Sequence, residues 1–184
     1  ARYASRRRAR EDGAKIYRSG AHALVHGFGL LYTIPSIALF VLMPLILGTS
    51  IISPVNVLVA LTIYTMALMV RSGVDAFNAV PEHVVESSRA LGYTPARAFF
   101  TVELPLALPV LFAGIRVATV ANIAMVSVGA VIGVSSLGTL FTDGLARSIP
   151  AELITGVGLS AALAYLADAL LALTARRLTA WRTA

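Results

Sequence analysis

Three sets of residues in this sequence have the types and spacing that could support binding or chemistry. Residues 86 to 105 combine a glutamate, a turn-forming glycine and a closing proline between long apolar stretches. Arg116 and Asp168 place opposite charges inside two of those stretches. His22 and His26 stand one helical turn apart, a spacing that metal sites use. Because no carboxylate or cysteine completes a site beside the histidines, we expect no bound metal.

Motifs for ATP hydrolysis and for hydrolytic catalysis are absent from the sequence. A Walker A loop needs a lysine followed by serine or threonine, but the single lysine, Lys15, is followed by Ile16. Neither a Gly-x-Ser-x-Gly elbow nor a His-Glu-x-x-His zinc motif occurs, and there is no cysteine. We therefore expect that this chain is not an enzyme and carries no cofactor.

The composition indicates an all-α polytopic membrane protein. The chain has 184 residues, of which 58% are hydrophobic and 13% charged, with a mean hydropathy of +0.82. The charges crowd into three short regions, so the stretches between them are suited to hydrocarbon rather than water. One transmembrane domain is expected over 1–184, with four spans at 28–47, 55–71, 106–134 and 153–175.

Basic residues flank these spans on one side, as the positive-inside rule requires. This arrangement places 1–27 at the cytoplasmic face or its interface, 72–105 in the cytoplasm and both ends inside. It also explains the net charge of +6 without nucleic-acid binding. The first segment begins at Ala1 and is too polar for a signal peptide, which leaves open a further helix before it. The basic flanks are Arg2, Arg6, Arg7, Arg8, Arg10, Lys15 and Arg18, then Arg71, Arg89 and Arg97, then Arg176, Arg177 and Arg182.

The cytoplasmic loop is expected to form two short helices joined by a tight turn. Pro81 suits the first turn of one helix, and Gly92 suits a left-handed residue at its end. Thr94 is then expected to cap a second helix that Pro95 opens. Pro105 is expected to mark the entry to the third span.

The loop resembles the EAA motif of binding-protein-dependent ABC importer permeases. That pattern is Glu-Ala-Ala, three residues, glycine, nine residues and Ile-x-Leu-Pro. The spacing matches throughout, with serine in place of both alanines and valine in place of isoleucine. The matching residues are Glu86, Ser87, Ser88, Gly92, Val102, Leu104 and Pro105.

Shorter segments are similar to the permeases of osmoprotectant importers, which carry glycine betaine, choline or carnitine. They are Thr33–Ser36, Glu103–Leu106, Ala113–Arg116 and Gly133–Gly138. The resemblance implies the MetI-like permease fold in the bacterial cytoplasmic membrane, with lipid around it. It implies two copies of an ATP-binding subunit that hold ATP and Mg, an extracytoplasmic substrate-binding protein, and a second permease subunit, identical or different.

In such a permease the loop docks in a groove of the ATPase. The resemblance implies that Gly92 sets the bend and that Glu86 caps or pairs within the docked loop. Val84, Val85 and Leu91 would supply apolar contacts. Residues proposed to line the pathway are Tyr32, Pro35, Ser36, Asn122, Met125 and Ser127.

Several interpretations stay open at this stage. Arg116 and Asp168 either form a structural pair or reach the interface separately; we favour the pair, since intramembrane ions are costly.

The transported solute could instead be methionine, a metal chelate or an oxyanion. A membrane-anchored helix-turn-helix over Glu82–Phe100 is disfavoured because its face carries only Arg89 and Arg97. A secondary transporter is disfavoured because the four spans show no internal repeat.

Overall fold

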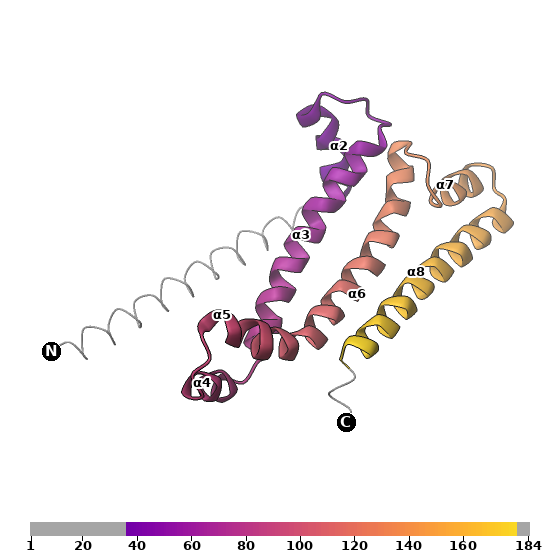
Figure 1. The fold of residues 1–184 in the computed structure, drawn as a ribbon. Helices are drawn as coiled ribbons and strands as arrows, with labels where there is room; N and C mark the ends of the chain where they lie inside the picture. The colour runs from indigo at the N-terminus through magenta and orange to yellow at the C-terminus, as the bar shows by residue number, and fades with distance from the viewer. Residues whose placement is uncertain (1–35, 180–184) are drawn as a thin grey trace.

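The structure, a computed structural model, describes residues 36–179 and is helical throughout this region (Figure 1). Short helices connect three long ones. In chain order the elements are α2 (Ser36–Leu47), α3 (Pro54–Asn78), α4 (Glu82–Ala90), α5 (Pro95–Ala98), the π-helical turn η1 (Phe99–Glu103), α6 (Leu104–Val128), the 3-10 turn η2 (Gly129–Ile132), α7 (Thr139–Ala146) and α8 (Pro150–Leu178).

The three long helices are the membrane-crossing elements of the described region. Helices α3, α6 and α8 contain 25, 25 and 29 residues, and each is apolar enough to cross a bilayer. At 1.5 Å per residue, 25 residues span about 37 Å, which exceeds the roughly 30 Å hydrocarbon core. Helix α6 lies between the other two and packs against both (Figure 1). The predicted all-α membrane fold is confirmed.

The first predicted span is only partly described. Helix α2 covers its last 12 residues, and positions 28–35 lie outside the described residues. Its buried side chains Phe40 and Met43 join Val57, Leu61 and Tyr64 of α3 in a small hydrophobic core. The turn between α2 and α3 is held by Asn56, whose fully buried amide donates to the carbonyl of Ser50 at 2.8 Å.

The third predicted span lies almost wholly within a longer helix. This helix runs without interruption from Pro95 to Ile132, and Pro105 is the second residue of its regular α6 segment. The π-helical turn η1 ends two positions before this proline, and its wider winding already lacks regular α-helical bonds. Pro105 stands at the start of the regular α6 segment, where its missing N–H is tolerated.

Two further segments are more helical than expected. Helix α3 continues to Asn78, seven residues into the segment expected to be the cytoplasmic loop. The segment between the third and fourth predicted spans contains helix α7, which packs against α8. Gly156 of α8 permits this packing, because a Cβ there would lie 2.9 Å from Leu140 Cβ of α7. A contact between helices therefore stabilises a segment whose local sequence resembles a loop.

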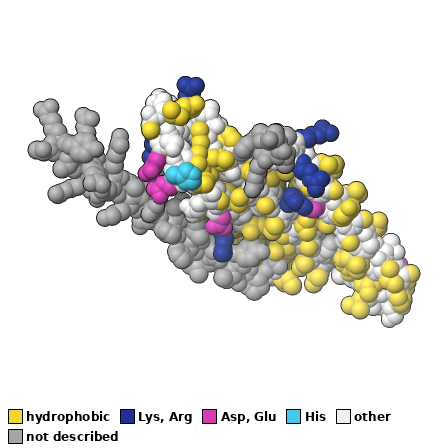
Figure 2. Space-filling view, turned by 90° about the horizontal axis from the view of Figure 1, so that it is seen from below, with side chains coloured by type: hydrophobic (Ala, Val, Ile, Leu, Met, Phe, Trp, Pro, Cys, Tyr) yellow, Lys and Arg dark blue, Asp and Glu magenta, His cyan; other side chains and the backbone are white. Residues whose placement is uncertain are grey.

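One end of the molecule is rich in charged side chains, and the flank is mostly hydrophobic. Helices α4 and α5 and the C-terminal end of α8 lie at one end of the bundle, and α7 lies at the other (Figure 1). Figure 2 looks onto the first end and shows charged side chains gathered there, with hydrophobic ones along the flank. In the most apolar stretch of α8 only 6% of residues are buried within the chain. Helix α8 thus offers most of its surface to lipid or to another subunit.

Candidate docking hairpin and intramembrane ion pair

The hairpin of α4 and α5 is built by local hydrogen bonds at Gly92. The N–H of Gly92 donates to the carbonyl of Arg89 at 3.0 Å, and the N–H of Tyr93 donates to that of Ser88 at 3.2 Å. These two bonds define a Schellman motif, which ends a helix with a left-handed residue. Gly92 has a φ of +85°, so the structure has the left-handed turn that the sequence predicts.

The second helix begins as its capping residues predict. Thr94 is the N-cap of α5, and its hydroxyl oxygen accepts from the N–H of Arg97 at 3.4 Å. The guanidinium of Arg97 lies 4.7 Å from the ring centre of Tyr93, a cation–π contact across the turn. These contacts fix the angle between the two helices without any partner protein.

Aromatic and small residues join the hairpin to the membrane helices. The rings of Phe77, near the end of α3, and Phe99, in η1, stack with their centres 5.4 Å apart. Ala76, Ser88 and Ala98 are buried where these elements meet. Since α5 is also continuous with α6, the hairpin is attached to two membrane helices at once.

Two large apolar side chains are exposed at the hairpin end of the bundle, one in the turn after α4 and one in η1. Leu91 is 79% exposed and Phe100 is 66% exposed. Val84 and Val85 are half-buried against the hairpin itself, so Leu91 is the more accessible of the three predicted contact residues. The Glu86 side chain is exposed in the middle of α4 and bonds to no described residue.

The other residues of the motif lie inside the hairpin or on its connection to α6. The hydroxyls of Ser87 and Ser88 donate to carbonyls of their own helix, those of His83 and Val85. Val102 lies in η1, and Leu104 and Pro105 begin α6; all three are half-buried. The motif thus divides into an exposed surface around Glu86 and Leu91 and a half-buried connection to the membrane.

Replacing Gly92 tests the left-handed turn. We expect Gly92→Ala to weaken binding of the ATPase subunit roughly 5- to 30-fold, because a Cβ in this conformation costs about 1–2 kcal/mol. Gly92→Asn is expected to lose less, since asparagine tolerates the left-handed region better. The measurement is the affinity of the purified permease for its ATPase subunit.

Two glycines provide matched controls for this substitution. A Cβ at Gly92, Gly48 or Gly73 meets no atom within 4 Å, so none of the three replacements causes a clash. Gly48 also has a positive φ but lies in the α2–α3 turn at the other end of the molecule, and Gly73 has an ordinary helical φ. If Gly48→Ala or Gly73→Ala weakens ATPase binding as much as Gly92→Ala, strain in the hairpin is not the cause.

Arg116 and Asp168, 52 positions apart, meet between α6 and α8. Arg116 Nε donates to Asp168 Oδ1 at 2.7 Å, and Nη2 donates to Oδ2 at 2.6 Å. This two-bond fork is the strongest geometry that a guanidinium and a carboxylate can form. Each side chain nevertheless stays partly exposed, 39% for Arg116 and 31% for Asp168.

The exposed side of the ion pair lines a groove of about 510 Å³. Its remaining walls are small apolar side chains of α6, namely Ala113, Val117, Val120 and Ala121. Most of these positions and Arg116 recur at helical spacing, three or four residues apart, on one side of α6. That spacing is visible in the sequence, but the participation of Asp168 depends on how α8 packs.

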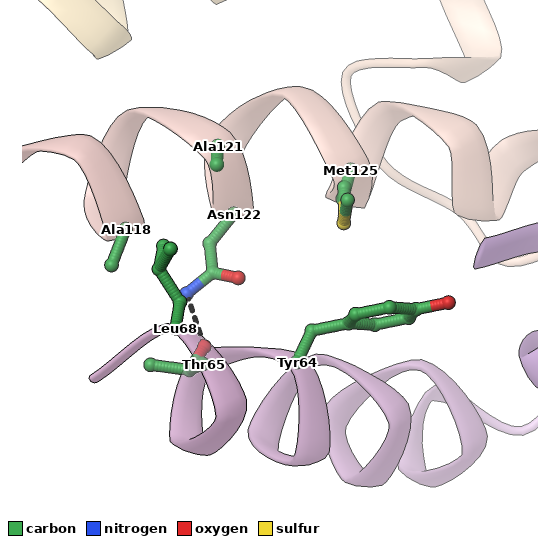
Figure 3. A pocket seen from close by; sticks show the side chains of 7 residues that line it. All are labelled: Tyr64, Thr65, Leu68, Ala118, Ala121, Asn122 and Met125. Atoms are coloured by element: carbon green, nitrogen blue, oxygen red, sulfur yellow. Dashed lines mark hydrogen bonds between the residues drawn. The ribbon is translucent and has the colours of Figure 1, made fainter. Parts of the chain in front are cut away.

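A second, much smaller cavity of about 10 Å³ lies between α3 and α6 (Figure 3). Asn122 and Met125 of α6 point toward α3, and Asn122 Nδ2 donates to Thr65 Oγ1 at 2.7 Å. Tyr64 and Leu68 complete its lining on α3. These two predicted pathway residues therefore face another helix of the same chain, and Thr65, which the sequence did not single out, is the partner of Asn122.

The remaining predicted residues are distributed differently. Ser127 is half-buried near the end of α6, where its backbone closely approaches Gly138. Tyr32 and Pro35, like His22 and His26, lie outside the described residues, and Ser36 is the first residue of α2. Among residues 36–179 there is no cluster of three His, Cys, Asp or Glu that could hold a metal ion.

Comparison with known proteins assigns the chain to a family. Residues 18–181 match the family described as binding-protein-dependent transport system inner membrane component. The chain is 41% identical over 145 residues to the osmoprotectant import permease protein OsmW of Salmonella typhimurium, covering 77% of this chain and 67% of OsmW.

Two other similar proteins broaden the comparison. The chain is 36% identical over 154 residues to the ergothioneine transport permease/ergothioneine binding protein EgtU of Helicobacter pylori, covering 83% of this chain but only 27% of EgtU. Its fold superposes on an inward-facing structure of the MetNI methionine ABC transporter with a TM-score of 0.73 and 26% identity, over 90% of this chain and 77% of that one.

The chain belongs to the family of inner membrane components of binding-protein-dependent transport systems, the permease subunits of ABC importers. This membership agrees with the resemblance carried by Glu86, Gly92 and Pro105. It favours a transport subunit over the helix-turn-helix interpretation of Glu82–Phe100.

Proposed function

We propose that this chain forms part of the pathway for an osmoprotectant such as glycine betaine, choline or carnitine. A separate ATPase, present in two copies with ATP and Mg, drives transport through the α4–α5 hairpin. A second permease subunit and an extracytoplasmic binding protein complete the transporter, and both ends of this chain lie in the cytoplasm.

The observation that carries the coupling role is that the hairpin end exposes apolar side chains and is attached to two membrane helices. Exposed leucine and phenylalanine side chains on a charged, water-facing end are suited to a partner's groove. The hairpin is attached to α6 through the continuous α5–α6 helix and to α3 through the Phe77–Phe99 stack. These attachments would connect a docked ATPase to both membrane helices.

The proposed orientation of the chain in the membrane rests on the basic residues at the hairpin end of the molecule. Arg71, Arg89, Arg97, Arg176 and Arg177 belong to α3, α4, α5 and the last turn of α8, which reach the hairpin end. Cytoplasmic flanks of membrane helices are enriched in such residues. This enrichment supports the proposal that α7 and the α2–α3 turn lie at the outer face, where a binding protein would dock.

The cargo assignment is supported by the relatives. OsmW is an osmoprotectant import permease and EgtU an ergothioneine transport permease. Ergothioneine, glycine betaine and carnitine are all betaines, small zwitterions that join a trimethylammonium group to a carboxylate. The likeness to the MetNI methionine transporter supports methionine as the second candidate.

Charged substitutions at the hairpin tip test the coupling role. We expect Leu91→Asp to reduce co-purification of the ATPase subunit by about tenfold or more, because burying an unpaired carboxylate in an apolar groove is costly. Phe100→Asp is expected to have a similar effect. The assay is pull-down of the ATP-binding subunit expressed together with the tagged permease.

Leu145 provides the matched control. It is 76% exposed, close to the 79% of Leu91, but lies on α7 at the opposite end of the bundle. Leu145→Asp should leave ATPase recovery unchanged, and equal loss from Leu145→Asp and Leu91→Asp would refute hairpin docking. A thermal-shift comparison of the cognate binding protein with betaine, choline, carnitine and methionine then separates the two cargo candidates.

A further inference from the structure

We propose that the groove beside the Arg116–Asp168 ion pair is a transient binding site for a small betaine on its way across the membrane. This inference rests on the proposed function and adds to it a site on the permease itself. It assigns the carboxylate of the solute to Arg116 and the quaternary ammonium to Asp168.

The position of the pair is the first support. Ionised side chains inside a membrane are costly and are found where they face other helices or a polar cavity. Arg116 is the middle residue of α6, Asp168 lies about two-thirds of the way along α8, and both line the groove of about 510 Å³. That volume falls within the range of small-molecule sites, which are mostly apolar with a few converging polar groups.

The second support is the remaining bonding capacity of the pair. A guanidinium has five N–H groups, and Asp168 takes two of those of Arg116. Among the described residues no other acceptor takes the remaining three. Each oxygen of Asp168 likewise keeps a lone pair, and both groups are about one-third exposed. This unused bonding capacity faces the groove.

The third support is charge complementarity. The pair has no net charge, so a solute with no net charge enters without leaving an unbalanced ion in the membrane. Free cations or anions would each be attracted by one partner and repelled by the other. The small apolar walls Ala113, Val117 and Val120 suit the methyl groups of a trimethylammonium. A betaine matches the charges and the apolar lining together.

Isosteric probes test this assignment directly. The permease–ATPase complex, in lipid nanodiscs and without binding protein, would be titrated with glycine betaine by calorimetry. The two comparison ligands are 3,3-dimethylbutyrate, which replaces the quaternary nitrogen by carbon, and choline, which lacks the carboxylate. We expect millimolar binding of betaine and at least about tenfold weaker binding of both comparison ligands. Absent betaine binding, or equal affinities of all three ligands, would overturn the proposal.

A double variant separates binding from folding. Arg116→Met with Asp168→Leu removes both charges and puts apolar side chains in their place, a change that proteins tolerate far better than removing one partner. We expect this variant to assemble with the ATPase, to retain basal ATP hydrolysis, and to lose betaine binding by about tenfold or more. Unchanged betaine binding by the assembled double variant would show that the pair is structural only.

These experiments distinguish failure of the groove as a binding site from failure of the proposed transport function. If neither wild type nor variant recruits an ATPase, the coupling role itself is refuted, whatever the groove binds. If the wild-type complex drives betaine uptake and the double variant does so equally well, the transport function stands and the groove is not a site. Loss of uptake with intact assembly and basal hydrolysis supports both.

Discussion

Gly138→Ala is expected to give the largest loss of stability of any glycine-to-alanine change within residues 36–179. Gly138 is buried at the beginning of α7, and a Cβ there would overlap the backbone carbonyl of Ser127 at the end of α6. Backbone atoms have no alternative rotamer, so either α7 or the end of α6 must move. We expect a cost of about 3 kcal/mol or more and a fall in the thermal inactivation midpoint of roughly 10 °C in detergent.

Gly158→Ala is the matched control for this prediction. A Cβ at Gly158, on α8, meets nothing within 4 Å, and alanine favours a helix over glycine by about 1 kcal/mol. The control should therefore be as stable as wild type or slightly more stable. Equal stability of Gly138→Ala and Gly158→Ala would show that the turn before α7 does not pack against Ser127 as described.

Asp168→Ala is expected to reduce the yield of folded permease several-fold. The substitution leaves the guanidinium of Arg116 without its two hydrogen bonds in the middle of a membrane helix. An unpaired ion there is expensive, and modest losses of stability already change cellular abundance several-fold. The measurement is the monodisperse fraction after detergent extraction, normalised to total protein in the membrane.

The double variant Arg116→Met with Asp168→Leu should recover most of that yield. Removing both charges replaces an ion pair by apolar packing and leaves no orphaned group. The single variant Arg116→Met should fall between the two, since an unpaired carboxylate can take up a proton and become neutral. If Asp168→Ala folds as well as wild type, the two side chains do not depend on each other for stability.

These predictions separate two functions of α6. Its beginning is continuous with the α5 helix of the hairpin, and its middle carries Arg116 and lines the groove. A single helix therefore joins the hairpin to the groove, without a loop between them. The π-helical turn η1 and Pro105 lie between the two regions, where the regular helical bonding is weakest. Bending of α6, if it occurs, is expected there.

The sequence by itself determined the membrane character, the hairpin and the family. These features depend on residues close together in the chain. Apolar stretches with few charges define spans, the left-handed turn at Gly92 favours glycine, and Thr94 with Pro95 begins a helix through bonds within one turn. The match between the spacing from Glu86 to Pro105 and the EAA motif can be seen without knowing which helices are in contact.

Only the tertiary structure decided the features that join distant segments. The partners Arg116 and Asp168 are 52 positions apart, and Asn122 and Thr65 are 57 apart. Which residues meet depends on the rotation and crossing of α3, α6 and α8, and local sequence does not encode either quantity. The same reason explains the helix at 139–146, which is stabilised by its contact with α8. The residues of the hairpin and its turn could thus be predicted from the sequence, whereas the groove forms only where α6 and α8 meet.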